Sequence, residues 1–198
     1  MESFWNQRYH VQEYVYGTSP NIFFSQVVKE LPPGKIILPC EGEGRNAVFA
    51  ASLGWETTAF DSSETGKQKA LTLALKENVA IDFVVGDAAF MNYSSYEADV
   101  VALIFAHLPP PIRTVLHKKS IEWLKPGGKI ILEAFNSLQL NNNSGGPKDI
   151  EMLYSKEMLQ NDFLGMRIDL LEELTTILNE GSFHNGKADI IRLVATKV

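Results

Sequence analysis

Short apolar runs alternate with helix-forming segments along the first half of the chain. Four runs with the length and the β-branched or aromatic content of buried strands lie at 35–40, 55–61, 81–87 and 98–105. A small-residue helical pattern follows the first run at 45–54, and after the second run Ser62 or Ser63 is placed to cap another helix. This alternation predicts an α/β fold with a mostly parallel sheet and helices on both faces.

The second half continues the pattern and ends differently. A helix is predicted at 109–124, and a Pro-Gly-Gly turn leads into a strand that ends at 135. The polar, Gly-rich tract 136–149 is predicted to be a loop, and loops of this length are often functional. Leucines in 166–181 have helical spacing, so periodicity leaves helix or strand open there. We interpret this segment as a sixth strand, joined by a hairpin to an antiparallel seventh at 188–198.

Composition limits the classes of partner. The 198 residues carry 45% hydrophobic and 21% charged side chains, which is typical of one globular domain. With 18 Lys and Arg against 24 Asp and Glu, and no basic cluster, nucleic-acid binding is not expected. The single Cys40, the absence of an apolar leader and the absence of a long apolar run predict a cytoplasmic protein without a membrane partner. A small-molecule partner is therefore expected, and the oligomeric state stays open.

The loop "ILPCEGEGRN" (37–46) has the spacing of a cofactor-binding turn. Gly42, Gly44 and Ala47 fit G-x-G-x-x-G/A between a strand and a helix, and Asp61 ends the next strand. Glycines let the backbone approach a ligand closely, and a carboxylate at the end of the second strand can accept hydrogen bonds from ribose hydroxyls. This pattern fits NAD as well as S-adenosylmethionine.

Two carboxylates in this loop distinguish the cofactors. Glu41 and Glu43 would add negative charge where a dinucleotide places its pyrophosphate. S-adenosylmethionine has no phosphate and carries a cationic sulfonium and an ammonium, which acidic neighbours favour. An alternative is that both glutamates are first-turn helix residues that point to solvent and are stabilised by the helix dipole.

The chain resembles the class I S-adenosylmethionine-dependent methyltransferases over nearly its whole length. The resemblance depends on "EGEGRNAVFAASLGWETTAFDSS", "GDA", "FAHLPPPIR", "LKPGGKIILEAF" and "EGSFHNGKADIIRLVA". Within that class the chain is similar to the small bacterial tellurite-resistance and thiopurine methyltransferases. The resemblance implies a Rossmann-like, seven-stranded sheet in the order 3-2-1-4-5-7-6 with strand 7 antiparallel. It also implies the cofactor S-adenosylmethionine and a small-molecule methyl acceptor.

The same resemblance implies roles for single residues. It places these residues at the cofactor: Cys40, Glu41, Gly42 and Gly44 under the methionine part, Asp61 and Ser62 at the ribose, Asp87 and Ala88 at the adenine, and Phe105 near the methionyl end. Many members have an acidic residue and then a glycine where this chain has Leu38 and Cys40. Glu41 is the candidate to replace that acid.

Residues after several strands are candidates for the methyl acceptor. In parallel α/β sheets ligands bind beyond the carboxyl ends of the strands, so His107, Asn136 and the pair Glu180 and His184 share one edge. His107 is the candidate catalytic base or donor, or it holds its own loop by bonding backbone. Asn136 and His184 are candidate acceptor contacts, although His184 also suits a turn role. The spacing of the four histidines predicts no metal site.

The N-terminal segment is rich in aromatic residues. Trp5 and Tyr16 are predicted to contact the acceptor as parts of a lid, while most of the other rings are expected to pack on the sheet. Arg8 could bind a carboxylate ligand or pair with a surface acid. The expected division of the single domain is a lid at 1–33, a cofactor core at 34–135, and an acceptor loop and C-terminal hairpin at 136–198.

The sequence favours a methyltransferase that acts on a sulfur or other chalcogen atom over one that acts on nitrogen or oxygen. Two alternatives stay open. An NAD-dependent oxidoreductase fits the glycine pattern but not the acidic loop. A non-catalytic S-adenosylmethionine-binding module would keep the loop but lack a formed acceptor cavity near Phe105 and His107.

Overall fold

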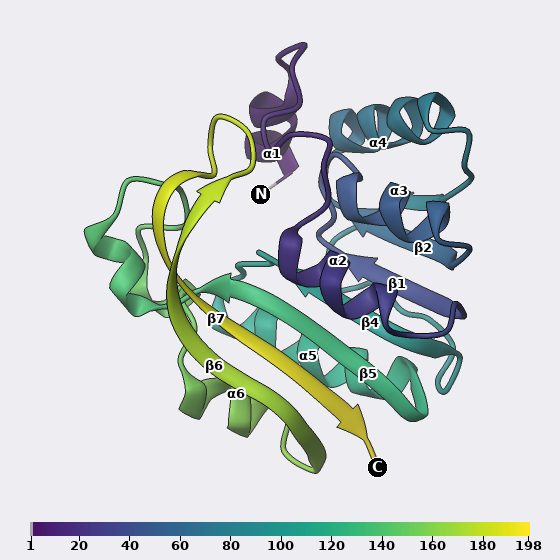
Figure 1. Cartoon of the computed structure of the whole chain (residues 1–198), viewed down its shortest axis with the longest axis vertical. Helices are drawn as coiled ribbons and strands as arrows, with labels where there is room; N and C mark the ends of the chain where they lie inside the picture. The colour runs from purple at the N-terminus through teal and green to yellow at the C-terminus, as the bar shows by residue number, and fades with distance from the viewer. Residues whose placement is uncertain (1) are drawn as a thin grey trace.

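The computed structural model describes residues 2–198 and contains a seven-stranded sheet in the order β3-β2-β1-β4-β5-β7-β6. The strands are β1 (Lys35–Pro39), β2 (Glu56–Asp61), β3 (Asp82–Val85), β4 (Ala98–Ile104), β5 (Leu124–Phe135), β6 (Met166–Asn179) and β7 (Asn185–Lys197). Strands β1 to β5 pair in parallel, and β7 runs antiparallel to both β5 and β6 (Figure 1). The predicted Rossmann-like class I methyltransferase fold is confirmed. Met1, the first residue of the predicted segment 1–33, lies outside the described residues.

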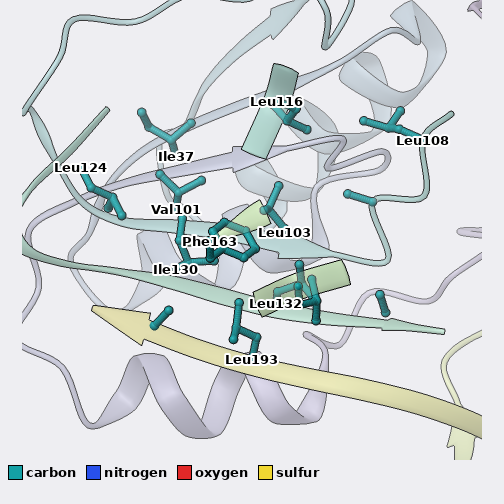
Figure 2. Packing of buried hydrophobic residues seen from close by; sticks show 14 of the residues in the cluster. Ile37, Val101, Leu103, Leu108, Leu116, Leu124, Ile130, Leu132, Phe163 and Leu193 are labelled. Atoms are coloured by element: carbon teal, nitrogen blue, oxygen red, sulfur yellow. The ribbon is translucent and has the colours of Figure 1, made fainter. Parts of the chain in front are cut away.

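Helices cover both faces of the sheet. They are α1 (Glu2–Tyr9), α2 (Ile22–Lys29), α3 (Arg45–Ser52), α4 (Glu64–Lys76), α5 (Pro110–Trp123) and α6 (Lys156–Asp162). Phe24 of α2 and Ala47 of α3 are fully buried on one face, with Ala70 of α4. Leu116 of α5 and Phe163 after α6 pack on the other face, where Figure 2 shows them against strand residues such as Leu103. The apolar runs of the sequence form the layer between these two sets of helices.

The C-terminal hairpin is a long, twisted arm of the sheet. Strand β6 pairs with β7 from Met166 opposite Lys197 to Asn179 opposite Asn185. The strand interpretation is therefore confirmed, and the helical spacing of leucines in β6 does not reflect a helix. A helix here would lose the backbone hydrogen bonds between β6 and β7. The hairpin brings residues 180–184 to the same edge of the sheet as the loop after β1 (Figure 1).

Three local features were not predicted from the sequence. The tract 136–149 was expected to be a loop, but Ser137–Asn141 within it form a 3-10 helix capped by Asn136. Helix α6 was not predicted. His117 of α5 is buried: it is 1% exposed, and its Nδ1 lies 2.8 Å from the Asp162 carboxylate. No helix among residues 2–198 has the length and apolar character needed to cross a bilayer.

Gly44 is a position where the fold requires glycine. Its φ is +87°, and a Cβ there would lie 2.4 Å from Ala70 Cβ on α4, so the loop after β1 contacts α4 through this residue. We expect Gly44→Ala to lower the free energy of unfolding by about 1–3 kcal/mol more than Gly165→Ala, because the added methyl overpacks the contact with α4. Gly165 is a matched control, since its φ is +89° and no atom lies within 4 Å of an added Cβ. Urea denaturation measures both, and equal losses would contradict the close contact.

Candidate functional site

A cavity of about 350 Å³ lies at the carboxyl ends of the central strands, between α1 and the hairpin loop. The predicted site residues that line it are Trp5, Tyr16, Cys40, Glu41, Gly42, Asp61, Ser62, Asp87, Ala88, Phe105, His107 and His184. Gly44 and Asn136 do not line it. Gly44 packs under α4, and Asn136 is 2% exposed, with its side chain bonded to the Ile190 carbonyl and the Leu138 N–H. Both residues serve the fold of their loops, and their ligand contacts stay predictions.

Two non-glycine residues in the cavity wall have left-handed backbones. Cys40 follows β1 with a φ of 55°, and Phe105 follows β4 with a φ of 51°. Such conformations are unfavourable for residues with a side chain and tend to occur at functional sites. Here they turn the chain sharply at the carboxyl ends of two adjacent strands. The Phe105 ring consequently lies against two other rings, with its centre 4.7 Å from that of Phe135 and 4.5 Å from that of His184.

Glu41 holds the start of α3. Its Oε1 accepts the backbone N–H of Asn46 (2.7 Å) and of Ala47 (2.8 Å), two donors that have no partner within the helix. Burial raises the pKa of this carboxyl to about 7, against the opposing effect of these bonds and of Arg45. The solvent-pointing alternative is wrong for Glu41, and its direct use as a ligand group is limited by the cap.

Glu43 is also turned inward. It is 4% exposed, accepts the N–H of Val15 at 2.9 Å, and forms an ion pair with Lys69 at 2.7 Å. It therefore ties the N-terminal segment to the cofactor loop and to α4. Both glutamates line the cavity, so their charge acts on a bound ligand even though their oxygens bond protein donors.

The acidic side of the cavity continues at β2 and β3. Asp61 accepts the N–H of Gly42 (3.0 Å) and of Ser63 (2.9 Å), which fixes the first glycine turn to the end of β2. Burial raises the pKa of Asp61 to about 6, more than these bonds lower it. Asp87 lies after β3 in the same wall. This wall suits a cation and opposes a pyrophosphate.

His107 does not have the free nitrogen that a base needs. Its Nδ1 lies 2.7 Å from the Met152 carbonyl and donates to it, and its Nε2 accepts the Phe135 N–H at 3.1 Å. Burial lowers the pKa of the ring to about 4. The geometry matches the structural alternative, in which His107 holds the loop after β4 against β5. His107 as a catalytic base stays a prediction that this arrangement does not favour.

His184 has the free nitrogen that His107 lacks. Its Nδ1 lies 3.4 Å from Glu180 Oε2, and since a carboxylate only accepts, the ring donates there and its Nε2 keeps a lone pair. Burial lowers the pKa of His184, so the ring is neutral. The Tyr16 ring covers the other side of the His184 ring, and the centres of the two rings lie 4.5 Å apart. His184 therefore combines a fixed orientation with a place in the cavity wall.

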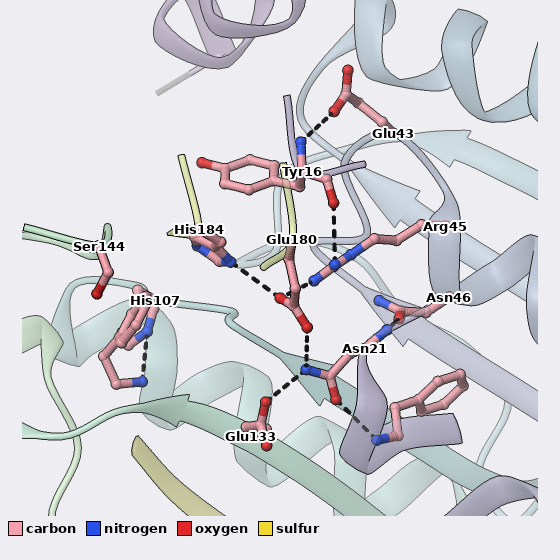
Figure 3. A network of polar contacts seen from close by, with 12 residues as sticks. Tyr16, Asn21, Glu43, Arg45, Asn46, His107, Glu133, Ser144, Glu180 and His184 are labelled. Carbon is pink, nitrogen blue, oxygen red and sulfur yellow. Dashed lines mark hydrogen bonds and ion pairs between the residues drawn. The ribbon is translucent and has the colours of Figure 1, made fainter. Parts of the chain in front are cut away.

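A buried polar network fixes Glu180 in turn (Figure 3). Arg45 forms an ion pair with Glu180 at 2.8 Å, and the Asn21 amide donates to Glu180 at 3.1 Å and to Glu133 at 2.6 Å. Arg192 pairs with Glu133 at 2.6 Å. The sequence did not predict a role in the site for Asn21, Arg45 or Glu133. No spacing rule connects residues so far apart in the chain.

Aromatic rings of the N-terminal segment cover the cavity. Trp5 stacks on Tyr9, whose ring meets Tyr16 edge to face. Tyr9 is 4% exposed, and a Cβ on Gly42 would lie 2.6 Å from its hydroxyl. The loop glycine thus lets the backbone run directly beneath this ring. Among residues 2–198, no three His, Cys, Asp or Glu side chains are grouped so as to hold a metal ion.

Comparisons with known proteins agree with this geometry. Residues 39–128 match a family model described as a methyltransferase domain, and no curated protein matches the chain. Many solved structures share the fold, among them the following three. A structure concerning the conversion of a disulfide bond into a thioacetal group during echinomycin biosynthesis has 15% identity and a TM-score of 0.81, covering 100% of this chain and 91% of that one. TehB from Haemophilus influenzae has 18% identity and a TM-score of 0.74, covering 100% and 67%.

The third is geranyl diphosphate C-methyltransferase from Streptomyces coelicolor A3(2), in complex with Mg²⁺, geranyl diphosphate and S-adenosyl-L-homocysteine. It has 11% identity and a TM-score of 0.70, covering 100% of this chain and 97% of that one. At these identities the three structures show the fold, and the family match gives the enzyme class. The prediction of a methyltransferase that uses S-adenosylmethionine is confirmed.

The buried Glu41 carboxyl predicts a pH-dependent stability. Its pKa of about 7 in the folded protein lies above the ordinary value, so the folded state holds the proton more tightly than the unfolded state. Stability from this group is complete below the ordinary glutamate pKa and is lost as the pH rises through 7. Glu41→Gln keeps an oxygen for the helix cap but does not titrate. We expect the unfolding free energy of Glu41→Gln to fall less steeply between pH 5 and 8 than that of the wild type, with slopes that differ by up to ~1.4 kcal/mol per pH unit.

Urea denaturation of both proteins across this pH range measures the difference. Asp61 also has a raised pKa and is present in both proteins, so its contribution cancels in the comparison. Equal slopes for the wild type and Glu41→Gln would show that Glu41 does not titrate in the folded state as its burial requires.

Proposed function

We propose that this enzyme transfers a methyl group from S-adenosylmethionine to a sulfur or other chalcogen atom of a small molecule. The observation that carries the proposal is the composition of the acceptor wall. Phe105, Phe135, Pro147 and Met152 contribute apolar surface, and the one histidine nitrogen there without a protein partner, among the described residues, is Nε2 of His184. A thiol suits this wall because it ionises near neutral pH and its anion attacks without strong base assistance.

A structural neighbour and the sequence motifs support this choice of atom. The neighbour concerns the conversion of a disulfide bond into a thioacetal group, which is chemistry at sulfur. The motifs of this chain are similar to those of the small bacterial tellurite-resistance and thiopurine methyltransferases. We propose that the chain belongs to that group.

The charges of the cavity wall support the proposed cofactor site. When bound, S-adenosylmethionine supplies a sulfonium methyl group to the attacking atom. Asp61 and Ser62 would hold its ribose and Asp87 and Ala88 its adenine, with Gly42 beneath the methionine part. The acidic wall stabilises the cation before transfer, and the alignment of the attacking atom with the methyl carbon is the main contribution of the protein.

His184 is proposed to act at the acceptor. Its Nε2 accepts the proton of a neutral thiol, and Glu180, bonded to the opposite nitrogen, stabilises the charge that the ring then gains. Trp5 and Tyr16 close the cavity over the acceptor and exclude water. A formed cavity at Phe105 and His107 disfavours the non-catalytic binding module, and the acidic wall disfavours NAD.

Isothermal titration tests the cofactor directly, with S-adenosylmethionine, S-adenosylhomocysteine and NAD in parallel. Tight binding of the two sulfur nucleotides alone is expected, followed by turnover in a screen of thiols, selenite and tellurite. Binding of NAD alone would refute the proposed function.

The predicted ribose contact gives a second test. Asp61→Ala should weaken S-adenosylmethionine by about 1.5–3 kcal/mol, the contribution of a charged hydrogen-bonding group. Asp99→Ala is the matched control, because Asp99 pairs with Lys125 outside the cavity. Thermal unfolding of each ligand-free variant separates loss of the site from loss of the fold. Unchanged affinity in Asp61→Ala would remove Asp61 from the cofactor site.

The proposed role of His184 predicts that its removal affects turnover but not cofactor binding. His184→Ala should reduce kcat with a neutral thiol about 100-fold, within the range of general base catalysis, while S-adenosylmethionine affinity stays the same. The exposed His10 provides a matched control in His10→Ala. Unchanged kcat in His184→Ala would show that the acceptor arrives deprotonated or binds elsewhere.

A further inference from the structure

One cation in the cavity wall has no acid to pair with among the described side chains. Arg45 pairs with Glu180 and Lys69 with Glu43, but none of the carboxylates that the structure describes lies within 4.0 Å of Arg8. Its nearest polar contact is a long bond of 3.4 Å to the Tyr16 hydroxyl. The described side chains therefore do not provide the surface acid of the alternative interpretation of Arg8.

Aromatic rings hold the Arg8 guanidinium in place. It lies 4.1 Å from the centre of the Phe183 ring and 5.1 Å from that of Phe4. These contacts are between a cation and aromatic rings and use no oxygen acceptor. Among the described residues, the one hydrogen bond of the guanidinium is that from Nη1 to the Tyr16 hydroxyl, so its other N–H donors remain available. A side chain held this way is ready for a ligand that accepts hydrogen bonds.

Arg8 joins the two elements that close the cavity. It comes from α1, whereas Phe183 belongs to the hairpin loop between β6 and β7, which approaches α1 in Figure 1. The neighbouring His184 experiences the Arg8 charge, which contributes to the lowered pKa of that ring after burial. Arg8 thus lies close to the proposed acceptor position.

The other charges of the cavity restrict where an anion can bind. Glu41, Glu43, Asp61 and Asp87 make the cofactor side acidic, and Arg45 is neutralised by Glu180. A carboxylate in the cavity would be repelled by that side and attracted to Arg8. The guanidinium fork matches a carboxylate in shape as well as in charge.

We propose that Arg8 is a carboxylate-binding subsite of this cavity. The inference rests on the proposed function and adds the chemistry of one ligand group to it. Two ligands could present the group: the amino-acid part of S-adenosylmethionine, or an acceptor that carries a carboxylate beside its apolar body. Either one would bind where α1 meets the hairpin loop, because Arg8 comes from α1 and contacts Phe183.

Binding to the full chain distinguishes these sources. In the first arm, S-adenosylmethionine and its decarboxylated form, which keeps the sulfonium and the ammonium, are titrated into the wild type and Arg8→Met. If the cofactor supplies the carboxylate, Arg8→Met binds S-adenosylmethionine about 10-fold to 100-fold more weakly and binds the decarboxylated form as the wild type does. Methionine keeps the apolar stem between the rings, and Arg8→Lys should retain part of the affinity.

In the second arm, benzoate and benzamide are titrated into protein loaded with S-adenosylhomocysteine. If the acceptor supplies the carboxylate, the wild type binds benzoate more tightly than benzamide and Arg8→Met loses the preference. Arg167→Met is the control for net charge, since the Arg167 side chain is 62% exposed on β6. The subsite would be overturned if Arg8→Met kept the wild-type selectivity for a carboxylate in both arms. It would also be overturned if Arg8→Met bound the carboxylate ligands and their neutral or decarboxylated counterparts more weakly by the same factor.

Both arms measure binding, so they do not depend on methyl transfer. If thiols are not methylated but Arg8→Met loses selectivity for a carboxylate, the proposed acceptor chemistry is wrong and the subsite stands. If thiols are methylated but the selectivity of Arg8→Met is unchanged, the proposed function stands and the subsite is wrong.

Discussion

The buried ion pair between Arg45 and Glu180 is the interaction on which the site depends. It joins the helix that follows the cofactor loop to the hairpin loop, across 135 positions of sequence, and both side chains are 8% exposed. Removing one partner of a buried pair typically destabilises a protein by about 3–5 kcal/mol, because the other charge is left unpaired. Through Glu180 the pair orients His184, and through a bond to the Tyr16 carbonyl Arg45 also positions the aromatic cover. The cofactor side and the acceptor side are therefore held in one arrangement by a single contact.

The acidic loop has two roles that physical chemistry links. Glu41 accepts backbone N–H groups at the start of α3, and Glu43 accepts the Val15 N–H of the N-terminal segment, so both hold the loop after β1 in its place. Holding those charges in a partly dry cavity is unfavourable, as the raised pKa of Glu41 shows. A cationic ligand relieves this cost and a pyrophosphate increases it. The residues that build the loop thus also select the class of ligand.

The sequence was sufficient for the sheet and for the edge at which the site lies. Strand and helix periodicity predicted the α/β architecture, the family motifs implied the strand order, and the strand–turn–helix rule located the loop after β1. It could not determine side-chain direction. Both His107 and His184 were placed at the right edge, but only coordinates show that His107 bonds backbone with both nitrogens and His184 with one. The polar network around Asn21 was also beyond reach, because its members are brought together by the hairpin and share no local pattern.

The central claim is methyl transfer from S-adenosylmethionine to a chalcogen atom, and the most direct test is the mass of the product. The purified protein is incubated with S-adenosylmethionine carrying a deuterated methyl group, together with an aromatic thiol, the matching phenol and the matching aniline. We expect the label on the thiol as a thioether, with equimolar S-adenosylhomocysteine and little label on the other two. Label on the phenol or the aniline in preference to the thiol, or tight cofactor binding with no transfer to thiols, selenite or tellurite, would contradict the claim.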